Sequence, residues 1–243
     1  MVTADEIAQL CYERFNELPR RGKPEPGREW TPLAAVVKIT RCAKSGRVEK
    51  EVVSLGSGTK CIGQTAMSPK GDVLNDSHAE VIARRGCIRC SHVSDLPAGF
   101  SVSAPIFLQS KLEFPFSQAQ TELQHKAGQG CITPCGAAVS WCKVPDQPLD
   151  VTASGIKQGV TKKALGTAKS RSALCKLELF HSFLSVVSST DASVLPDSLR
   201  RTDLHTYLDY KEASEAYQQA WQLLRNQAFP LWPRSNRDLL LFK

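Results

Sequence analysis

Two runs rich in β-branched residues, separated by a short polar turn, constrain the fold of this chain more than any other feature. The runs are PLAAVVKIT at residues 32–40 and VEKEVVSLGSG at residues 48–58, and the turn is RCAKSGR. This pattern predicts an antiparallel β-hairpin. The second run continues into the glycine-rich turn GSGTKCIG, whose glycines permit positive φ and a close approach of the backbone to a ligand. A helix predicted to begin at Asp76 follows, so the chain must pack a sheet against helices.

Patterns elsewhere in the chain also favour an α/β class. A helix is predicted over residues 3–18, with Thr3 as its N-cap and Glu6 three residues later, a capping box. The runs AAVSWCKV and PLDVTASG predict a second pair of strands, and SRSALCKLELFHSFLSVV predicts a helix. The longest helical pattern runs from Thr202 to Phe229.

The middle of the chain is less regular. Residues 94–116, SDLPAGFSVSAPIFLQSKLEFPF, predict short strands interrupted by prolines. Residues 117–130, SQAQTELQHKAGQG, are polar and predict a loop.

Net charge and cysteine content indicate which kind of partner and which compartment to expect for this chain. The net charge of +7 favours a polyanionic partner such as RNA, although a merely basic soluble protein has the same charge. The nine cysteines are odd in number and scattered, which argues against a disulfide framework and for a reducing, intracellular compartment, nuclear and/or cytoplasmic. No run approaches the roughly 20 apolar residues of a membrane span, so no membrane contact is expected. No protein partner is predicted.

The stretch LNDSHAEVIARR carries the strongest candidate for catalysis. His78 and Glu80 form the H-x-E half of the zinc deaminase signature, in which the histidine binds the metal and the glutamate moves protons. An H-x-E pair alone is also common at the start of a surface helix.

The flanking residues resemble those of the adenosine-to-inosine RNA editing deaminases, the ADAR-type family. GTKCIG precedes LNDSHAEVIARR, with Thr59 standing 19 residues before His78. The segments PCGAAVSW, PDQPLDVTASG, GVTKKALG and EAYQQAW resemble the branch of the family that acts on tRNA. The resemblance implies hydrolytic, zinc-dependent deamination of adenosine to inosine next to the anticodon of alanine tRNA.

The same resemblance implies the fold and the roles of site residues. The fold is expected to be a deaminase-like (cytidine-deaminase-type) mixed sheet flanked by helices. It forms one domain over residues 1–243, with a helical lead-in at 1–30, an N-terminal part at 31–86 and a C-terminal part at 87–243. The family pattern assigns His78 to zinc and Glu80 to proton transfer. It places Thr59 and Lys60 near the target nucleotide.

A lysine among aromatic residues predicts an internal anion. Tyr207, Lys211, Ser214 and Trp221 fall on one face at helical spacing, and burying an unpaired lysine there costs several kcal/mol. The family resemblance implies inositol hexakisphosphate as the anion. The residues at the family's contact positions are Asn75, Arg84, Arg85, Lys176, Tyr207, Lys211, Tyr217 and Trp232.

The chain departs from the family at the metal. A catalytic zinc site has three protein ligands, and the family takes two from cysteine motifs of the PCGD and SCSDK types. The chain has one Pro-Cys-Gly, which makes Cys135 the candidate second ligand, and no Ser-Cys-Ser-Asp-Lys. However, the residues around Cys135 resemble a later, non-ligand segment of the family.

The stretch after Arg85 also resembles this late part of the family. The central segment is therefore expected to be absent and the fold incomplete, with the join at Cys87 and Cys90. These two cysteines, with Cys131 and Cys135, have a spacing that also suits a structural zinc. The alternative to an enzyme is a catalytically inactive RNA-binding or regulatory form.

Overall fold

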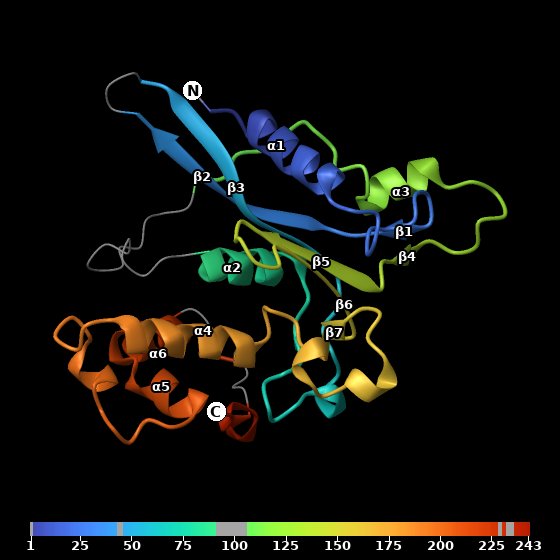
Figure 1. Cartoon of the computed structure of the whole chain (residues 1–243). Coiled ribbons are helices and arrows are strands. Elements are labelled where there is room, and N and C mark those ends of the chain that lie inside the picture. The colour runs from blue at the N-terminus through green and yellow to red at the C-terminus, as the bar shows by residue number, and fades with distance from the viewer. Residues whose placement is uncertain (1, 43–45, 91–105, 228–229, 232–235) are drawn as a thin grey trace.

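A five-stranded antiparallel sheet forms the centre of the molecule. The computed structural model describes residues 2–42, 46–90, 106–227, 230–231 and 236–243. The strand order is β2-β3-β5-β6-β7, and Figure 1 shows the sheet between helical layers. The strands are β2 (Leu33–Arg41), β3 (Val48–Ser57), β5 (Ala137–Cys142), β6 (Leu149–Ala153) and β7 (Ile156–Lys157). Sheets flanked by helices confirm the predicted mixed α/β class.

Both predicted strand pairs are present. Strands β2 and β3 pair from Leu33 opposite Ser57 to Arg41 opposite Val48, and β5 pairs antiparallel with β6. Strand β3 also pairs with β5, which joins the N-terminal and C-terminal parts of the chain in one sheet. A separate two-stranded parallel pair, β1 (Glu29–Trp30) with β4 (Thr133–Pro134), lies outside this sheet.

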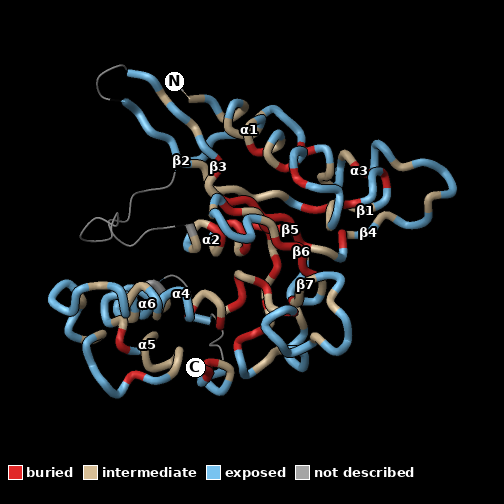
Figure 2. Tube along the Cα trace, in the orientation of Figure 1, coloured by how far each residue is buried: buried red, intermediate tan, exposed pale blue. Residues whose placement is uncertain are grey.

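Helix α1 (Ala4–Glu17) covers one face of the sheet. Thr3 and Glu6 form the predicted capping box, and Phe15 is fully buried against Leu55 of β3 and Val139 of β5. Figure 2 shows the buried trace concentrated in the central strands β3, β5 and β6. This apolar cluster is the main core of the described structure.

Helix α2 (Ala79–Cys90) covers the opposite face, and small residues let it approach closely. Ser54 donates a 2.6 Å hydrogen bond from its Oγ to the carbonyl of Ala83. A Cβ at Gly56 would come within 2.6 Å of the Ala79 carbonyl oxygen, and a Cβ at Gly86 would lie 2.9 Å from the Ser54 Cβ. Glycine at both positions is therefore required for this packing.

The C-terminal helices form a third layer with its own aromatic cluster. Helices α4 (Lys176–Ser189) and α5 (Tyr207–Ala213) contribute Phe180 and Tyr207, which pack with Phe242. The predicted single helix over residues 202–229 is wrong, because α5 ends before Ser214, whose φ/ψ of −78°/68° is not helical, and α6 (Glu215–Gln227) follows.

Two further expectations for the middle of the chain need correction. Helix α3 (Gln118–Gln124) occupies part of the predicted loop, and the Ser117 side chain caps it. Residues 106–116 form no strand, and the rest of the predicted strand region, residues 94–105, lies outside the described residues. Among the residues that the structure describes, no helix combines the length and the apolar character that crossing a membrane requires.

Candidate active site and anion-binding cluster

The start of α2 lies directly against the glycine-rich turn that follows β3. Ser77 N donates to the Lys60 carbonyl at 2.8 Å, and Ala79 N donates to the Gly58 carbonyl at 3.1 Å. Gly58 has φ +142°, and a Cβ there would lie 2.1 Å from the Ser77 carbonyl oxygen. Backbone pairing thus places Thr59 and Lys60 beside the segment that carries the predicted catalytic residues.

The imidazole of His78 is oriented by its neighbour Asp76. The Asp76 Oδ1 atom lies 2.8 Å from His78 Nδ1 and also accepts the His78 backbone N–H at 2.9 Å. With Nδ1 bonded to the carboxylate, Nε2 is the nitrogen available to a ligand. The His78 side chain is 41% exposed, so the ring is half-buried rather than fully in solvent.

Glu80 lies on the exposed surface of the first turn of α2. Its carboxylate makes no hydrogen bond or ion pair with any residue in the described ranges. A carboxylate that moves protons must reach the reacting group. The exposed position leaves Glu80 near His78 in sequence but without a partner that fixes it.

A pocket of about 390 Å³ lies on the other side of this segment. The predicted substrate residues Thr59 and Lys60 line it, together with Ser77, and its far wall comes from β5 and the turn between β6 and β7. The Thr59 Oγ1 atom is buried and has no hydrogen-bond partner in the described structure. His78 and Glu80 are not among the lining residues, so the pocket and the predicted catalytic pair do not share one cavity.

The residues for a catalytic zinc do not come together in the described part of the chain. No group of three or more histidine, cysteine, aspartate or glutamate side chains there has an arrangement that could hold a metal ion. Cys135 is buried. Its Sγ atom lies 3.8 Å from the Gly22 carbonyl oxygen, and its backbone N–H donates a hydrogen bond to the Trp30 carbonyl. Burial raises the pKa of its thiol, which disfavours the thiolate that a metal requires.

The structural zinc alternative has no better support. Cys131 is exposed and Cys135 buried, while Cys87 lies half-buried on α2. The side chain of Cys90 lies outside the described residues. The described chain therefore does not fit the zinc that the family resemblance implies.

Four predicted anion contacts do gather in one place. Burial lowers the pKa of Lys176, and the nearby charges of Arg85 and Lys211 lower it further. Burial also lowers the pKa of Arg85, with Arg84 acting in the same direction. No carboxylate within the described ranges forms an ion pair with any of these four cations.

Aromatic and amide groups complete this cluster. Burial raises the pKa of Tyr207, Tyr217 raises it further, and the charges of Arg85 and Arg84 lower it. The Asn75 Oδ1 atom is buried without a hydrogen-bond partner in the described structure. Tyr217 is exposed, and Trp232 lies outside the described residues. The converging cations supply the hydrogen-bond donors that a polyanion needs, whereas Asn75 Oδ1 is an acceptor.

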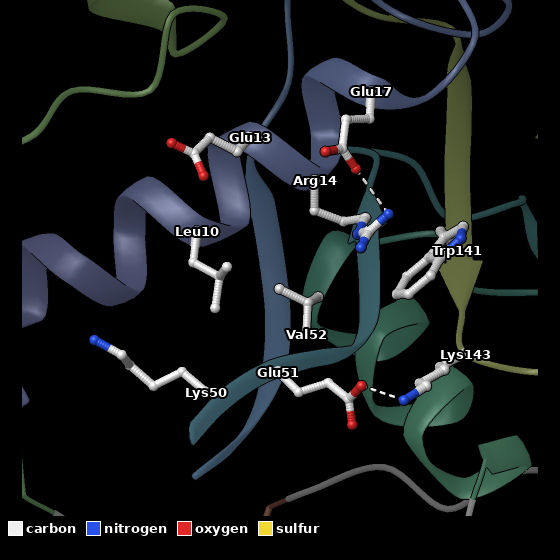
Figure 3. A pocket seen from close by; sticks show the side chains of 9 residues that line it. All are labelled: Leu10, Glu13, Arg14, Glu17, Lys50, Glu51, Val52, Trp141 and Lys143. Carbon is white, nitrogen blue, oxygen red and sulfur yellow. Dashed lines mark hydrogen bonds and ion pairs between the residues drawn. The ribbon is translucent and has the colours of Figure 1, made fainter. Parts of the chain in front are cut away.

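A second pocket, which no sequence motif predicts, lies between α1, β3 and β5. Figure 3 shows Arg14 reaching Glu17 at 2.7 Å, while Lys143 pairs with Glu51. The Arg14 guanidinium also lies 4.7 Å from the centre of the Trp141 ring. Three glutamates and three cations line this pocket, so it has no net electrostatic preference for a charged ligand.

Comparisons with known proteins identify relatives of the chain. The adenosine-deaminase (editase) domain matches residues 54–90 and 87–236. The tRNA-specific adenosine deaminase 1 of Homo sapiens is 27% identical over 502 aligned residues that cover both chains completely. The tRNA-specific adenosine deaminase 1 of Drosophila melanogaster is 49% identical over 87 residues, 36% of this chain and 21% of the relative. The double-stranded RNA-specific adenosine deaminase of Rattus norvegicus is 40% identical over 86 residues, 35% of this chain and 7% of the relative.

The length of the alignment also concerns the prediction that the central segment of the family is absent from this chain. The alignment with the human relative spans 502 positions, whereas this chain has 243 residues, so more than half of the positions have no counterpart here. The two matched segments of the domain meet at residues 87–90. This is the place where the sequence predicts the join between early and late parts.

Proposed function

Because the chain belongs to the adenosine-deaminase (editase) domain family, we propose that it comes from the lineage that converts adenosine to inosine in tRNA. The full-length similarity to tRNA-specific adenosine deaminases supports this lineage. The reaction of the lineage is a hydrolysis, in which oxygen from water replaces the amino group at C6 of adenine and ammonia leaves. By family the chain is an RNA adenosine deaminase.

For this chain itself, the proposed function is tRNA binding with little or no deamination. The proposal rests on a difference between the residues for RNA and anion binding and the residues for metal binding. Thr59 and Lys60 line a pocket and the cation cluster is assembled, whereas the described residues hold no three-ligand metal group. A deaminase without its metal retains the means to bind RNA but not to activate water.

Within this proposal, each site residue keeps the role that the resemblance implies. His78 is the remaining metal-binding residue of the lineage, Asp76 sets its tautomer, and Glu80 is the proton-transfer residue. Thr59 and Lys60 contact the target nucleotide and its backbone. Residues 1–243 form one domain, in which the parts at 31–86 and 87–243 share the central sheet.

We propose inositol hexakisphosphate, or an anion of similar charge, for the cluster around Arg85. The depressed pKa of Lys176 supports this assignment, as does the lack of an ion pair between any of the four cations and a carboxylate in the described ranges. The anion would supply negative charge to side chains that otherwise repel one another. The residues that would hold it are Asn75, Arg84, Arg85, Lys176, Tyr207, Lys211, Tyr217 and Trp232.

The experiment that tests the proposed function measures tRNA affinity and metal content on the same purified chain. We expect an alanine tRNA transcript to bind with strong salt dependence, and less than one zinc per chain after dialysis against a weak chelator. The His78→Ala variant is the control, and its zinc content should equal that of the wild type. Failure to bind the transcript at low salt would exclude the proposal.

A second candidate function, an active deaminase, is favoured by one observation. Asp76 holds the imidazole of His78 with Nε2 free, which is the orientation of a metal-binding histidine. One zinc per chain that disappears in His78→Ala would favour this candidate over the first.

A further inference from the structure

A long segment of the C-terminal part carries only one sign of charge. Residues 151–177 contain six lysines and arginines and no aspartate or glutamate. Lys162, Lys163 and Lys169 are exposed, and they lie on two short 3₁₀ turns that fold back beside β7. In Figure 2 this loop is pale blue along most of its length.

A second basic segment, remote in sequence, lies against this loop. Arg20 and Arg21 are exposed in the loop that follows α1. The Arg21 guanidinium donates to the carbonyl of Gln158, and it approaches Gly159 so closely that a Cβ there would lie 2.8 Å from Nη2. The fold thus brings two loops of net positive charge together, and we call Arg20, Arg21, Lys162, Lys163 and Lys169 the basic surface.

The charges of the basic surface are not neutralised within the described structure. None of its five residues forms an ion pair with a carboxylate in the described ranges. The pocket between α1 and β3 provides the contrast, because Arg14 and Lys143 there each pair with a glutamate. Like charges held together repel one another, so their assembly indicates an anionic partner outside the chain.

The basic surface continues from the wall of the Thr59 pocket. Ser154 and Gly155 line that pocket, and the strand that follows them, β7, leads directly into the lysine loop. Lys60 is exposed and also lines the pocket. A nucleotide in the pocket would therefore have its neighbouring phosphates near exposed cations.

We propose that the basic surface binds the phosphate backbone of folded RNA on one side of the Thr59 pocket. This proposal rests on the proposed function, since it names the surface through which the chain holds its RNA. Lysines and arginines on mobile side chains suit sequence-independent phosphate contacts, which fix the register of the RNA but read no bases. The surface is separate from the Arg85 cluster, which faces the helices of the third layer.

The test compares two double variants that remove the same charge. Lys162→Ala/Lys163→Ala removes two cations of the basic surface, and Lys38→Ala/Arg41→Ala removes two exposed cations near the tip of the β2–β3 hairpin, at the opposite side of Figure 1. The affinity for an unmodified tRNA transcript is measured at several salt concentrations. Each phosphate contact adds about 1 to the slope of log affinity against log salt.

We expect the Lys162/Lys163 variant to bind more weakly and with a slope smaller by about 2, and the hairpin variant to bind as the wild type does. If the Lys162/Lys163 variant has the same tRNA affinity and salt slope as the wild type, the assignment of the basic surface to RNA is overturned. Binding of tRNA by the wild type would still leave the proposed function intact. If the wild type binds no tRNA, the proposed function itself fails. Loss of binding to phosphatidylserine vesicles with unchanged tRNA affinity would mark a lipid surface and contradict the proposal.

Discussion

At the scale of single residues, the site separates into groups that have partners and groups that do not. His78 is held by Asp76 through both its ring and its backbone, whereas Glu80 in the first turn of α2 has no partner in the described structure. Thr59 keeps a buried hydroxyl without a hydrogen bond. The sequence motifs single out these side chains, but a motif carries no information on which of them face one cavity.

Lys176 provides a test of the anion cluster. Burial lowers the pKa of its ammonium group, so the folded chain binds the proton less tightly than the unfolded chain does. Without an anion, stability should therefore rise with pH through the interval just below the ordinary lysine pKa of 10.5. Inositol hexakisphosphate should remove this dependence, and at 100 times its Kd it should stabilise the wild type by about 2.7 kcal/mol.

The matched variants are Lys176→Met and, as the control, Lys38→Met on the exposed hairpin. At pH 7 without ligand, Lys176→Met should melt at a higher temperature than the wild type, and it should gain less on addition of inositol hexakisphosphate. The control should respond to the ligand as the wild type does. An equal response in all three proteins would show that the anion does not bind at Lys176.

At the scale of elements, the packing of α2 on β3 positions the candidate site. Helix α2 begins one residue after His78, and its contact with the sheet depends on Gly56, Gly86 and the Ser54 hydrogen bond. Any shift of the helix along the sheet would therefore move His78 away from the Thr59 turn. The position of α2 on the sheet therefore determines the position of the candidate site.

Adding a single methyl group at Gly56 tests the close packing of α2 on β3. In Gly56→Ala the new Cβ meets the Ala79 carbonyl oxygen and Ile82 Cβ at 2.6 and 2.7 Å, so the helix must shift. The expected loss in the free energy of unfolding is about 1–3 kcal/mol, measured by urea denaturation. Gly63→Ala is the control, because nothing lies within 4 Å of a Cβ there. Equal urea midpoints for the two variants would contradict the close packing.

Local signals were sufficient for some elements and not for others. The capping box of α1 and the β-branched runs of the hairpin act over a few residues, so the sequence predicted them. The break at Ser214 was missed because apolar spacing continues across it, while the turn depends on local hydrogen bonds such as that from Ser214 Oγ to the Tyr210 carbonyl. The parallel pair of Glu29 with Thr133 and the contact of Arg21 with Gln158 join distant segments, and no local pattern reports them.

At the scale of the whole molecule, the two matched parts of the domain form one sheet without the central segment. Strand β3 pairs with β5 across the join, and the core around Phe15 and Leu55 is fully buried. Exposed apolar side chains remain at Ile106, Phe107 and Leu108, which are 86%, 88% and 70% exposed. The described structure therefore leaves some apolar surface uncovered, while the main core is retained.

Under the proposed function, the missing metal ligands distinguish the chain from an active deaminase at this scale. Its three ligands must come from distant parts of a domain, and the family draws two of them from motifs that this chain lacks or places elsewhere. The prediction that the ligand set is incomplete rests on a missing motif, which can be read directly from the sequence. It left Cys135 open, and the burial of Cys135 beside Gly22 and Trp30 argues against it.

Inosine formation tests the central claim, that the chain keeps the RNA-binding side of the site without its catalytic metal. The measurement is inosine produced in an alanine tRNA transcript by the wild type and by Glu80→Gln, with zinc and inositol hexakisphosphate both supplied. We predict that inosine from the wild type equals that from the variant, while both proteins bind the transcript with the same affinity. Rapid inosine formation by the wild type that is absent from Glu80→Gln would contradict the account.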